Sequence, residues 1–149
     1  MNITVIGGGN IGTLMAAEAT NKGHSITVYT SKPHKWEKCI DVYDSNENLL
    51  IRGVMSKVTD NMEVALKDAD YVWVTVPAQV FSIIAKKMAP YVTSKQKIGI
   101  VPGFGGAEFV FKSEIEKGCT FFWIAKGTQH CKTKGIWKIS LSIRKKEMS

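Results

Sequence analysis

The sequence predicts an α/β fold with a doubly wound, mostly parallel sheet and helices on both faces. Its first strand-like run, residues 3–6, is β-branched and is followed by a glycine-rich turn and an alanine-rich helical stretch. A second strand at residues 25–30 completes a strand–helix–strand unit, which is right-handed and therefore joins two parallel strands. Further strand-like and helical segments alternate as far as residue 122, which predicts one such domain over residues 1–122.

The glycine-rich turn has the spacing G-x-G-x-x-G between a strand and a helix, the context that makes this motif informative. Gly7 is expected to make the tight turn, Gly9 to let the backbone approach a pyrophosphate, and Gly12 to let the helix pack closely on the strand. The free amides and positive dipole end of the helix would hold the phosphate charge. The turn therefore predicts a Rossmann-type dinucleotide site, and a turn without a ligand is the less favoured alternative. The cofactor-binding residues expected here are Gly7, Gly8, Gly9, Asn10, Ile11 and Gly12.

The tip of the second strand is expected to select the cofactor. NAD enzymes usually place Asp or Glu there to bind the ribose 2′-hydroxyl. This chain has Thr30, Ser31 and Lys32 instead, a hydroxyl pair and a cation that suit a 2′-phosphate. The sequence thus favours NADP over NAD as the cofactor. The alternative is that Lys32 and Lys35 only form a solvated face.

The middle of the chain is less regular. A short helix is expected at 33–39, a polar, turn-rich segment at 41–48, and short strands at 49–51 and 54–58. One of these strands should lead to the third position of the sheet. Asp60 and Asn61 then signal the start of a short helix at 62–66.

The fourth strand, within residues 70–77, is nearly all apolar and is expected to be buried on both faces. Ligands bind at the carboxyl ends of parallel strands, so the end of this strand should border the cofactor. The residues expected to border the cofactor are Thr75 to Ala78, of which Val76, Pro77 and Ala78 are assigned as cofactor contacts. Apolar residues of the next helix recur at helical spacing and are interpreted as core, not as a cofactor contact. They are Val80, Ile83, Ile84 and Met88.

A fifth strand at 97–101 runs into a small-residue loop, in which Gly103 is a further expected cofactor contact. A helix at 107–117 and a sixth strand at 119–122 complete the pattern. The inward residues of this helix are expected to be Phe109 and either Val110 or Phe111.

The composition of the sequence argues against several classes of protein. No apolar run approaches the roughly 20 residues that span a bilayer, so no membrane partner is expected. No signal peptide is expected, because the first strand begins at Asn2. Cys39, Cys119 and Cys131 lack metal-ligand spacing, which predicts no metal site and reduced thiols in a cytoplasmic protein.

Three segments together resemble the N-terminal NAD(P)-binding domain of the opine dehydrogenase family, the octopine and nopaline dehydrogenases. The wider relatives are ketopantoate reductase, glycerol-3-phosphate dehydrogenase and 6-phosphogluconate dehydrogenase. The resemblance covers roughly residues 1–122, and the third segment is the most discriminating. The segments are MNITVIGGGNIGTLMAAEATNKGH, VTVPAQVF and PGFGGAEFVF.

The resemblance implies an oxidoreductase that condenses an amino acid with a 2-oxo acid and reduces the resulting imine with NADH or NADPH. It also implies that the catalytic His lies in a second, helical domain, which this chain is expected to lack. No catalytic residue is therefore assigned to His24, His34 or His130, which lack a cleft position and an orienting partner. The chain alone is expected to bind cofactor weakly and to turn over nothing, because the site for the hydride acceptor is missing.

Two alternatives stay open. One is a stand-alone dinucleotide-binding or redox-sensing module; the other is a domain like those of ketopantoate reductase or glycerol-3-phosphate dehydrogenase. Apolar surface left by a missing second domain would favour a homo-oligomer.

Residues 123–149 differ in character from the rest. The 24 residues 126–149 contain seven Lys and Arg but only one acid, whereas residues 1–125 are nearly balanced, with 13 Lys and Arg and 12 Asp and Glu. One hypothesis is a basic arm for nucleic acid or an acidic surface. The favoured hypothesis is a shifted reading frame, because a one-nucleotide shift at Trp123 (TGG, then the A of Ile124) yields glycine and permits a family-like continuation. Nucleic acid is accordingly not favoured as a partner.

Overall fold

A parallel sheet organises the domain, as the sequence predicts. The computed structural model describes residues 1–44, 46–101, 106–115, 118–123 and 132–133. Every strand pair of the main sheet is parallel. Numbered by position in the chain, the spatial order is 3-2-1-4-5-6, the classic doubly wound order of dinucleotide-binding domains. Its strands are, in spatial order, β5 (Lys57–Thr59), β2 (Ser25–Tyr29), β1 (Asn2–Ile6), β6 (Tyr71–Val74), β7 (Lys97–Ile100) and β8 (Thr120–Trp123).

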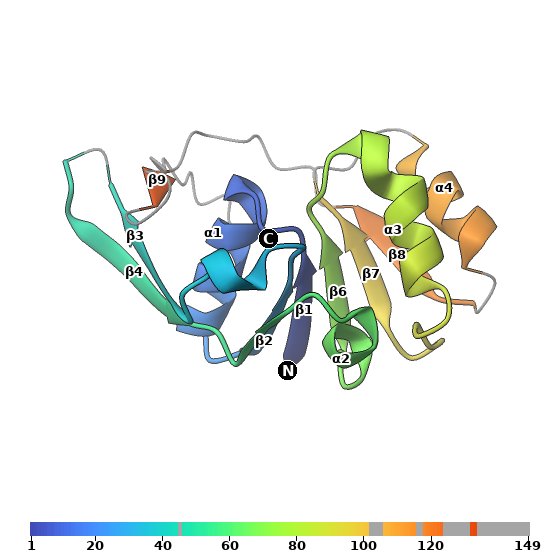
Figure 1. Cartoon of the computed structure of the whole chain (residues 1–149), viewed down its shortest axis with the longest axis horizontal. Helices are drawn as coiled ribbons and strands as arrows, with labels where there is room; N and C mark the ends of the chain where they lie inside the picture. The colour runs from blue at the N-terminus through green and yellow to red at the C-terminus, as the bar shows by residue number, and fades with distance from the viewer. Residues whose placement is uncertain (45, 102–105, 116–117, 124–131, 134–149) are drawn as a thin grey trace, which may run out of the picture.

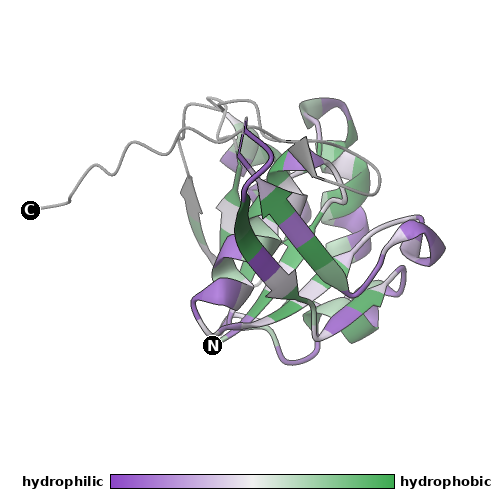
Figure 2. Ribbon diagram, turned by 90° about the vertical axis from the view of Figure 1, so that its left-hand side faces the viewer, coloured by the Kyte–Doolittle hydropathy of each residue, from purple (hydrophilic) through white to green (hydrophobic). Residues whose placement is uncertain are grey.

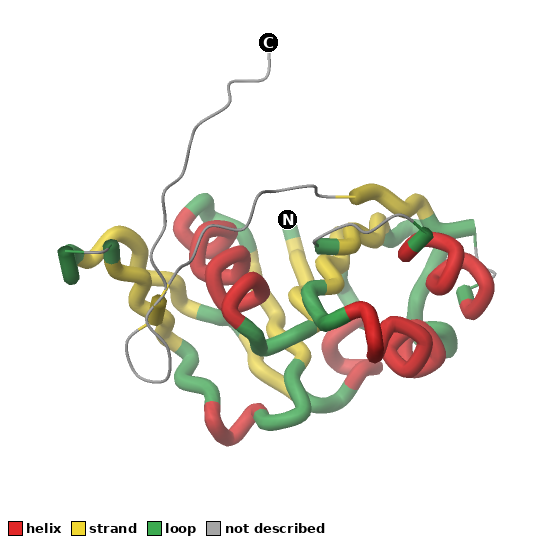
Figure 3. The backbone as a smooth tube through the Cα atoms, turned by 90° about the horizontal axis from the view of Figure 1, so that it is seen from above, coloured by secondary structure: helices red, strands yellow, loops and turns green. Residues whose placement is uncertain are grey.

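Helices cover both faces of this sheet (Figures 1 and 3). One face packs on α1, around buried residues such as Val5, Ala16 and Val28. The other face packs on α2, α3 and α4, around residues such as Leu66, Met88 and Phe111. None of the helices in the described ranges is both long and apolar enough to cross a lipid bilayer. The helices are α1 (Asn10–Asn21), η1 (Pro33–Lys35), α2 (Met62–Leu66), η2 (Ala78–Val80), α3 (Phe81–Met88) and α4 (Ala107–Glu114).

A second, antiparallel sheet lies beside α1 (Figure 1). It is formed by β4 (Leu49–Val54), β3 (Cys39–Tyr43) and β9 (Lys132–Thr133), in that spatial order. Of the helix predicted at 33–39, only the 3₁₀ turn η1 forms. The turn-rich segment predicted at 41–48 is wrong at residues 41–43, which belong to β3. The strand forms because Ile40 and Val42 alternate inward against α1, a pattern that the acidic residue between them hides.

The start of α2 agrees with expectation, whereas the strand predicted at 54–58 does not form as one: Val54 ends β4, and the next strand, β5, begins only at Lys57. Asn61 caps α2 by accepting a hydrogen bond from the Val64 N–H, at 3.1 Å. β5 occupies the third position of the sheet beside β2.

The predicted inward faces of α3 and α4 need correction at one residue each. Ile83 is 55% exposed and Phe109 is 68% exposed. α3 begins only at Phe81, after the 3₁₀ turn η2, so its inward stripe contains Phe81 and Ile84 and leaves Ile83 outside. On α4 the inward ring is Phe111, whose centroid lies 5.5 Å from that of Phe81.

β6 is buried on one face only, contrary to expectation. Val72 and Val74 are fully buried, but Tyr71 and Trp73 are half-buried and line an open groove of about 320 Å³ beside α1. Within the described residues no helix covers β6 on this side, because α1 lies over β1 and β2.

Candidate dinucleotide-binding site

The glycine turn lies where the strand order reverses, between β1 and β6. Such a switch point leaves a crevice at the carboxyl ends of the strands. The β1 end is held on both sides: the Gly7 N–H donates to the Tyr29 carbonyl at 3.0 Å, and the Thr75 N–H donates to the Ile6 carbonyl at 2.8 Å. The sheet therefore fixes the position at which α1 begins.

The N-terminus of α1 is suited to an anion. Gly9 is its N-cap residue, and no side chain caps it within the described part of the chain. The first turn contains no acidic residue. Gly7, with a φ of 124°, turns the chain from β1 toward the helix in a conformation that glycine adopts most readily. Helix amides without a side-chain acceptor, together with the helix dipole, form a site for phosphate oxygens.

Gly12 sets how closely α1 approaches the sheet. A Cβ atom at this position would lie 2.2 Å from the Gly7 carbonyl oxygen and 2.6 Å from Thr75 Oγ1. The Thr75 hydroxyl donates toward the Ile6 and Gly7 carbonyls, at 3.1 and 3.3 Å, and so ties β6 to the turn. Thr75, which the sequence places at the edge of the site, is thus a structural part of it.

Gly9 faces open space, in contrast to its neighbours. A Cβ at Gly9 would have no atom within 4 Å, whereas one at Gly8 would lie 2.9 Å from both Thr30 Oγ1 and Trp36 Nε1. The turn is therefore packed on the side of β2 and open above the helix start. Trp36 was not expected at the site; a lone indole after a strand carries no recognisable signal, and only the fold brings it to the turn.

The tip of β2 lies beside this turn. Thr30 is buried, and its Oγ1 accepts a hydrogen bond from the Lys32 N–H at 3.3 Å. Ser31 and Lys32 are exposed. Residues 30–36 include no carboxylate, so the exposed cation is not neutralised within the segment.

The end of β6 lies beside the glycine turn, since a Cβ at Gly7 would lie 3.1 Å from Val76 Cγ1. Val76 is half-buried, and Pro77 and Ala78 are exposed as the chain enters η2. Asn10 is exposed and Ile11 half-buried at the start of α1. Gly103 lies outside the described residues, so its expected contact remains a prediction.

No histidine in the described residues lies at the crevice. His24 precedes β2 at the amino edge of the sheet, opposite the glycine turn, and His34 is exposed on η1. His130 lies outside the described residues. In the described part of the chain no group of His, Cys, Asp and Glu side chains could hold a metal ion.

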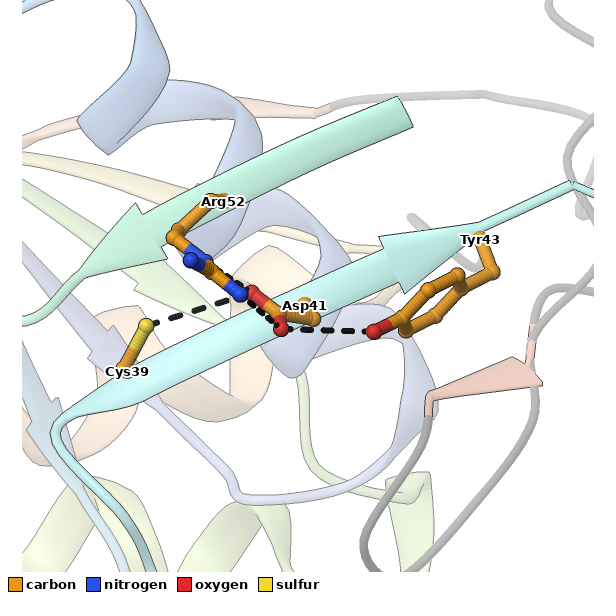
Figure 4. A network of polar contacts seen from close by, with 4 residues as sticks. All are labelled: Cys39, Asp41, Tyr43 and Arg52. Carbon is orange, nitrogen blue, oxygen red and sulfur yellow. Dashed lines mark hydrogen bonds and ion pairs between the residues drawn. The ribbon is translucent and has the colours of Figure 1, made fainter. Parts of the chain in front are cut away.

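A polar cluster on the hairpin lies apart from this site (Figure 4). Arg52 donates to both carboxylate oxygens of Asp41 at 2.7 Å, and the Tyr43 hydroxyl donates to Asp41 at 3.3 Å. The hydrogen bonds from Arg52 lower the pKa of Asp41, and those to Asp41 raise the pKa of Arg52. The cluster joins β3 to β4 and contacts neither the glycine turn nor the tip of β2.

Comparison with known proteins places the chain in a family. Residues 2–140 match the family model described as the NAD-dependent glycerol-3-phosphate dehydrogenase N-terminus. The chain is 29% identical over 119 residues to the glycerol-3-phosphate dehydrogenase (NAD(P)+) of Acinetobacter baylyi, and 26% identical over 125 residues to that of Teredinibacter turnerae. These alignments cover 77% of this chain but only 33% and 35% of the relatives, so the chain spans about a third of their length.

Solved structures share the fold. An octopine dehydrogenase determined with NADH and pyruvate superposes with a TM-score of 0.71 at 22% identity, covering 83% of this chain and 35% of that one. A PanE/ApbA family ketopantoate reductase from Ralstonia eutropha superposes with a TM-score of 0.68 at 12% identity, covering 83% and 40%. The comparisons confirm the predicted group of dehydrogenases. Within this group the family model matches glycerol-3-phosphate dehydrogenase, one of the wider relatives of the opine dehydrogenases. The chain belongs to the NAD-dependent glycerol-3-phosphate dehydrogenase N-terminal family, the NAD(P)-binding domain of an oxidoreductase.

Proposed function

We propose that this domain binds the pyrophosphate of NADP(H) or NAD(H) over the glycine turn, with Gly7 to Gly12 as its contacts. The observation that carries the proposal is the N-terminus of α1, which lacks a side-chain cap and an acid and opens above Gly9. Val76, Pro77 and Ala78 would flank the nicotinamide half across the switch point. The bound cofactor supplies or accepts a hydride; the residues of this domain bind and orient it.

The test of this site is Gly9→Val. The position has open space and a φ of −82°, so a side chain should be accommodated without disturbing α1. It would occupy the space proposed for the pyrophosphate. We expect loss of NADPH and NADH binding by calorimetry, with an unchanged far-UV circular dichroism spectrum and melting temperature. Undiminished binding by the folded variant would overturn the assignment of the turn.

We further propose that NADP(H) is preferred, because Thr30, Ser31 and Lys32 offer hydroxyls and a cation where a carboxylate would repel a 2′-phosphate. Lys32→Asp should weaken NADPH binding relative to NADH. Lys22→Asp is the matched control, since Lys22 is also exposed but ends α1 at the opposite edge of the sheet. An unchanged NADPH-to-NADH ratio in Lys32→Asp would show that the strand tip does not select the cofactor.

For the whole protein, we propose hydride transfer between NAD(P)(H) and a small substrate held by a second domain. The family match favours oxidation of the secondary alcohol of glycerol 3-phosphate to a ketone. The segment PGFGGAEFVF favours the second candidate, reduction of an imine formed from an amino acid and a 2-oxo acid. Its helix start agrees with α4, which begins at Ala107. Assays of the longer protein with glycerol 3-phosphate and with amino acid and 2-oxo acid pairs separate the two.

We also propose that residues 123–149 result from a shifted reading frame; the family match, which runs to residue 140, then includes the first 18 of these residues, 123–140. The test is the nucleotide sequence from codon 118 through the region after the stop codon. A long frame encoding a helical domain with a His, opened by a one-base shift near Trp123, supports the proposal. An uninterrupted stop with nothing after it would support a self-contained cofactor-binding module instead.

A further inference from the structure

The indole ring of Trp36 lies against the glycine turn. A Cβ atom at Gly8 would lie 2.9 Å from Trp36 Nε1 and 3.1 Å from Trp36 Cζ2. The same Cβ would lie 2.9 Å from Thr30 Oγ1. The edge of the ring that carries the N–H therefore faces the backbone of the turn, at the point where the turn meets the tip of β2. A side chain at position 8 would displace the indole from this place.

Trp36 is held in position by the segments on either side of it. It ends η1, and its backbone N–H donates to the Pro33 carbonyl at 3.0 Å. The chain then enters β3, and the Lys38 carbonyl accepts a hydrogen bond from the Met55 N–H at 2.7 Å. Figure 2 shows the β3–β4 hairpin, with its hydrophobic strands and hydrophilic tip, whose buried residues share a cluster with the Trp36 ring. The ring is thus fixed before a ligand binds, and a fixed contact loses little conformational entropy on binding.

The indole N–H of Trp36 has no acceptor among the described residues. Every buried side-chain nitrogen and oxygen in the described part of the chain has a hydrogen-bond partner. Trp36 is half-buried, and its Nε1 has no partner there, so this nitrogen is accessible to solvent. An indole nitrogen is a donor only, and it can therefore recognise an oxygen acceptor of a ligand.

This donor lies where a dinucleotide places its adenosine ribose. In Rossmann domains the pyrophosphate lies at the N-terminus of the first helix, and the ribose 2′-hydroxyl is bound near the tip of the second strand. Gly8 lies between the open position Gly9 and Thr30 at that tip, and Trp36 Nε1 lies beside Gly8. The indole N–H thus adds a fixed donor to the exposed side chains of Ser31 and Lys32.

We propose that Trp36 contacts the adenosine ribose of the cofactor, with its indole N–H donating to the oxygen at the 2′ position. This assignment rests on the proposed function of the glycine turn. The acceptor is a phosphate oxygen in NADP(H) and a hydroxyl oxygen in NAD(H). A hydrogen bond to a charged oxygen is about twice as strong as one between neutral groups, so the indole adds to the preference for NADP(H). Trp36 takes no part in hydride transfer.

The test is Trp36→Phe, which removes the donor and keeps an aromatic ring. Trp73→Phe is the matched control, because Trp73 is also half-buried and packs against the same cluster, but lines the groove beside α1 with Met1 and His24. Binding of NADPH and of NADH to the full chain is measured by calorimetry. We expect Trp36→Phe to weaken NADPH binding about tenfold or more and NADH binding by a smaller factor. Trp73→Phe should change neither, and both variants should keep the circular dichroism spectrum of the wild type.

The outcomes separate this inference from the proposed function. A wild type that binds neither nucleotide contradicts the proposed function, and the role of Trp36 with it. A wild type that binds both, beside a Trp36→Phe variant that binds them equally well, contradicts the role of Trp36 alone. Loss of both nucleotides by the same factor in Trp36→Phe also contradicts it, because a merely structural ring does not distinguish the 2′ groups.

A second measurement follows the indole N–H directly in the wild type, so it does not depend on the folding of a variant. In a ¹H–¹⁵N correlation spectrum, the Trp36 indole peak is the one that Trp36→Phe removes. Saturating NADPH should move this peak downfield, as a new hydrogen bond does, and leave the Trp73 indole peak in place. A Trp36 peak that stays in place at saturation would rule out the indole as a donor to the cofactor.

Discussion

Gly12→Ala tests the reasoning that the glycine at this position exists for packing. The new Cβ would lie 2.2 Å from the Gly7 carbonyl oxygen, which belongs to the backbone at the end of β1. Moving that oxygen would break hydrogen bonds, because the Gly7 N–H donates to the Tyr29 carbonyl and the Thr75 hydroxyl donates to the Gly7 carbonyl itself. α1 must shift instead, and with it the buried contacts of Ala16 and Ala17.

The magnitude follows from two opposing effects. Overpacking of a core contact costs typically 1–3 kcal/mol, and a backbone neighbour places this site near about 3 kcal/mol. Replacing glycine by alanine within a helix stabilises the helix by about 0.5–1 kcal/mol. The net loss in the free energy of unfolding is about 2 kcal/mol, which corresponds to a melting temperature lower by roughly 4–8 °C in a chain of this size.

The assay is thermal unfolding of Gly12→Ala beside Gly9→Ala, followed by circular dichroism. Gly9 is three residues away, and a Cβ there would have no atom within 4 Å. Its variant should melt within about 2 °C of the wild type, as expected for an exposed substitution without a specific contact. Equal melting temperatures for the two variants would refute the assignment of Gly12 to close helix–strand packing.

Other perturbations test contacts outside the site. Gln96→Leu removes a buried side-chain amide whose Nε2 donates to the Leu66 carbonyl at 2.6 Å and whose Oε1 accepts from the Thr93 N–H at 3.0 Å. The free energy of unfolding in urea should fall by about 2 kcal/mol. An unchanged urea midpoint would contradict this role. Asp41→Asn should destabilise the domain at neutral pH but not in acid. Arg52 lowers the pKa of Asp41 below its ordinary value of 3.8, so this stabilisation is complete above that value and is lost as the pH falls through the lowered pKa. Urea titrations at both pH values measure the difference, and a difference that persists in strong acid would rule out the charge pair as its source.

Much of the fold is encoded in local patterns. The run from Ile3 to Gly12 predicts β1, the turn and the start of α1, because strand propensity, glycine conformations and helix amides are properties of neighbouring residues. The same holds for the Asn61 cap of α2. These parts of the domain are therefore readable without a structure. The strand order 3-2-1-4-5-6 is one of those that right-handed connections allow, and the structure decides between them.

The candidate site is predictable to the same extent. The glycine turn and the tip of β2 are contiguous segments, and their meeting follows from the parallel pairing of β1 with β2. Thr75 is expected from the sequence because it ends the fourth strand, whereas Trp36 reaches the turn from a separate segment, so only the fold reveals it. A side chain that arrives from a separate element leaves no periodic signal in the sequence.

By itself the sequence determined most elements of the parallel sheet and the dinucleotide motif, but not the strand β3. Only the tertiary structure decided which of their faces are covered. Trp73 has the apolar character of a buried residue, yet it stays half-buried, because α1 lies over β1 and β2 and not over β6. Asp41 has the character of a turn residue, yet it lies in a strand, because its neighbours Ile40 and Val42 are buried against α1, and Arg52 on the adjacent strand pairs with its charge. Hydrogen bonding within a helix or turn depends on neighbours along the chain, whereas burial and charge pairing depend on residues that only folding brings near.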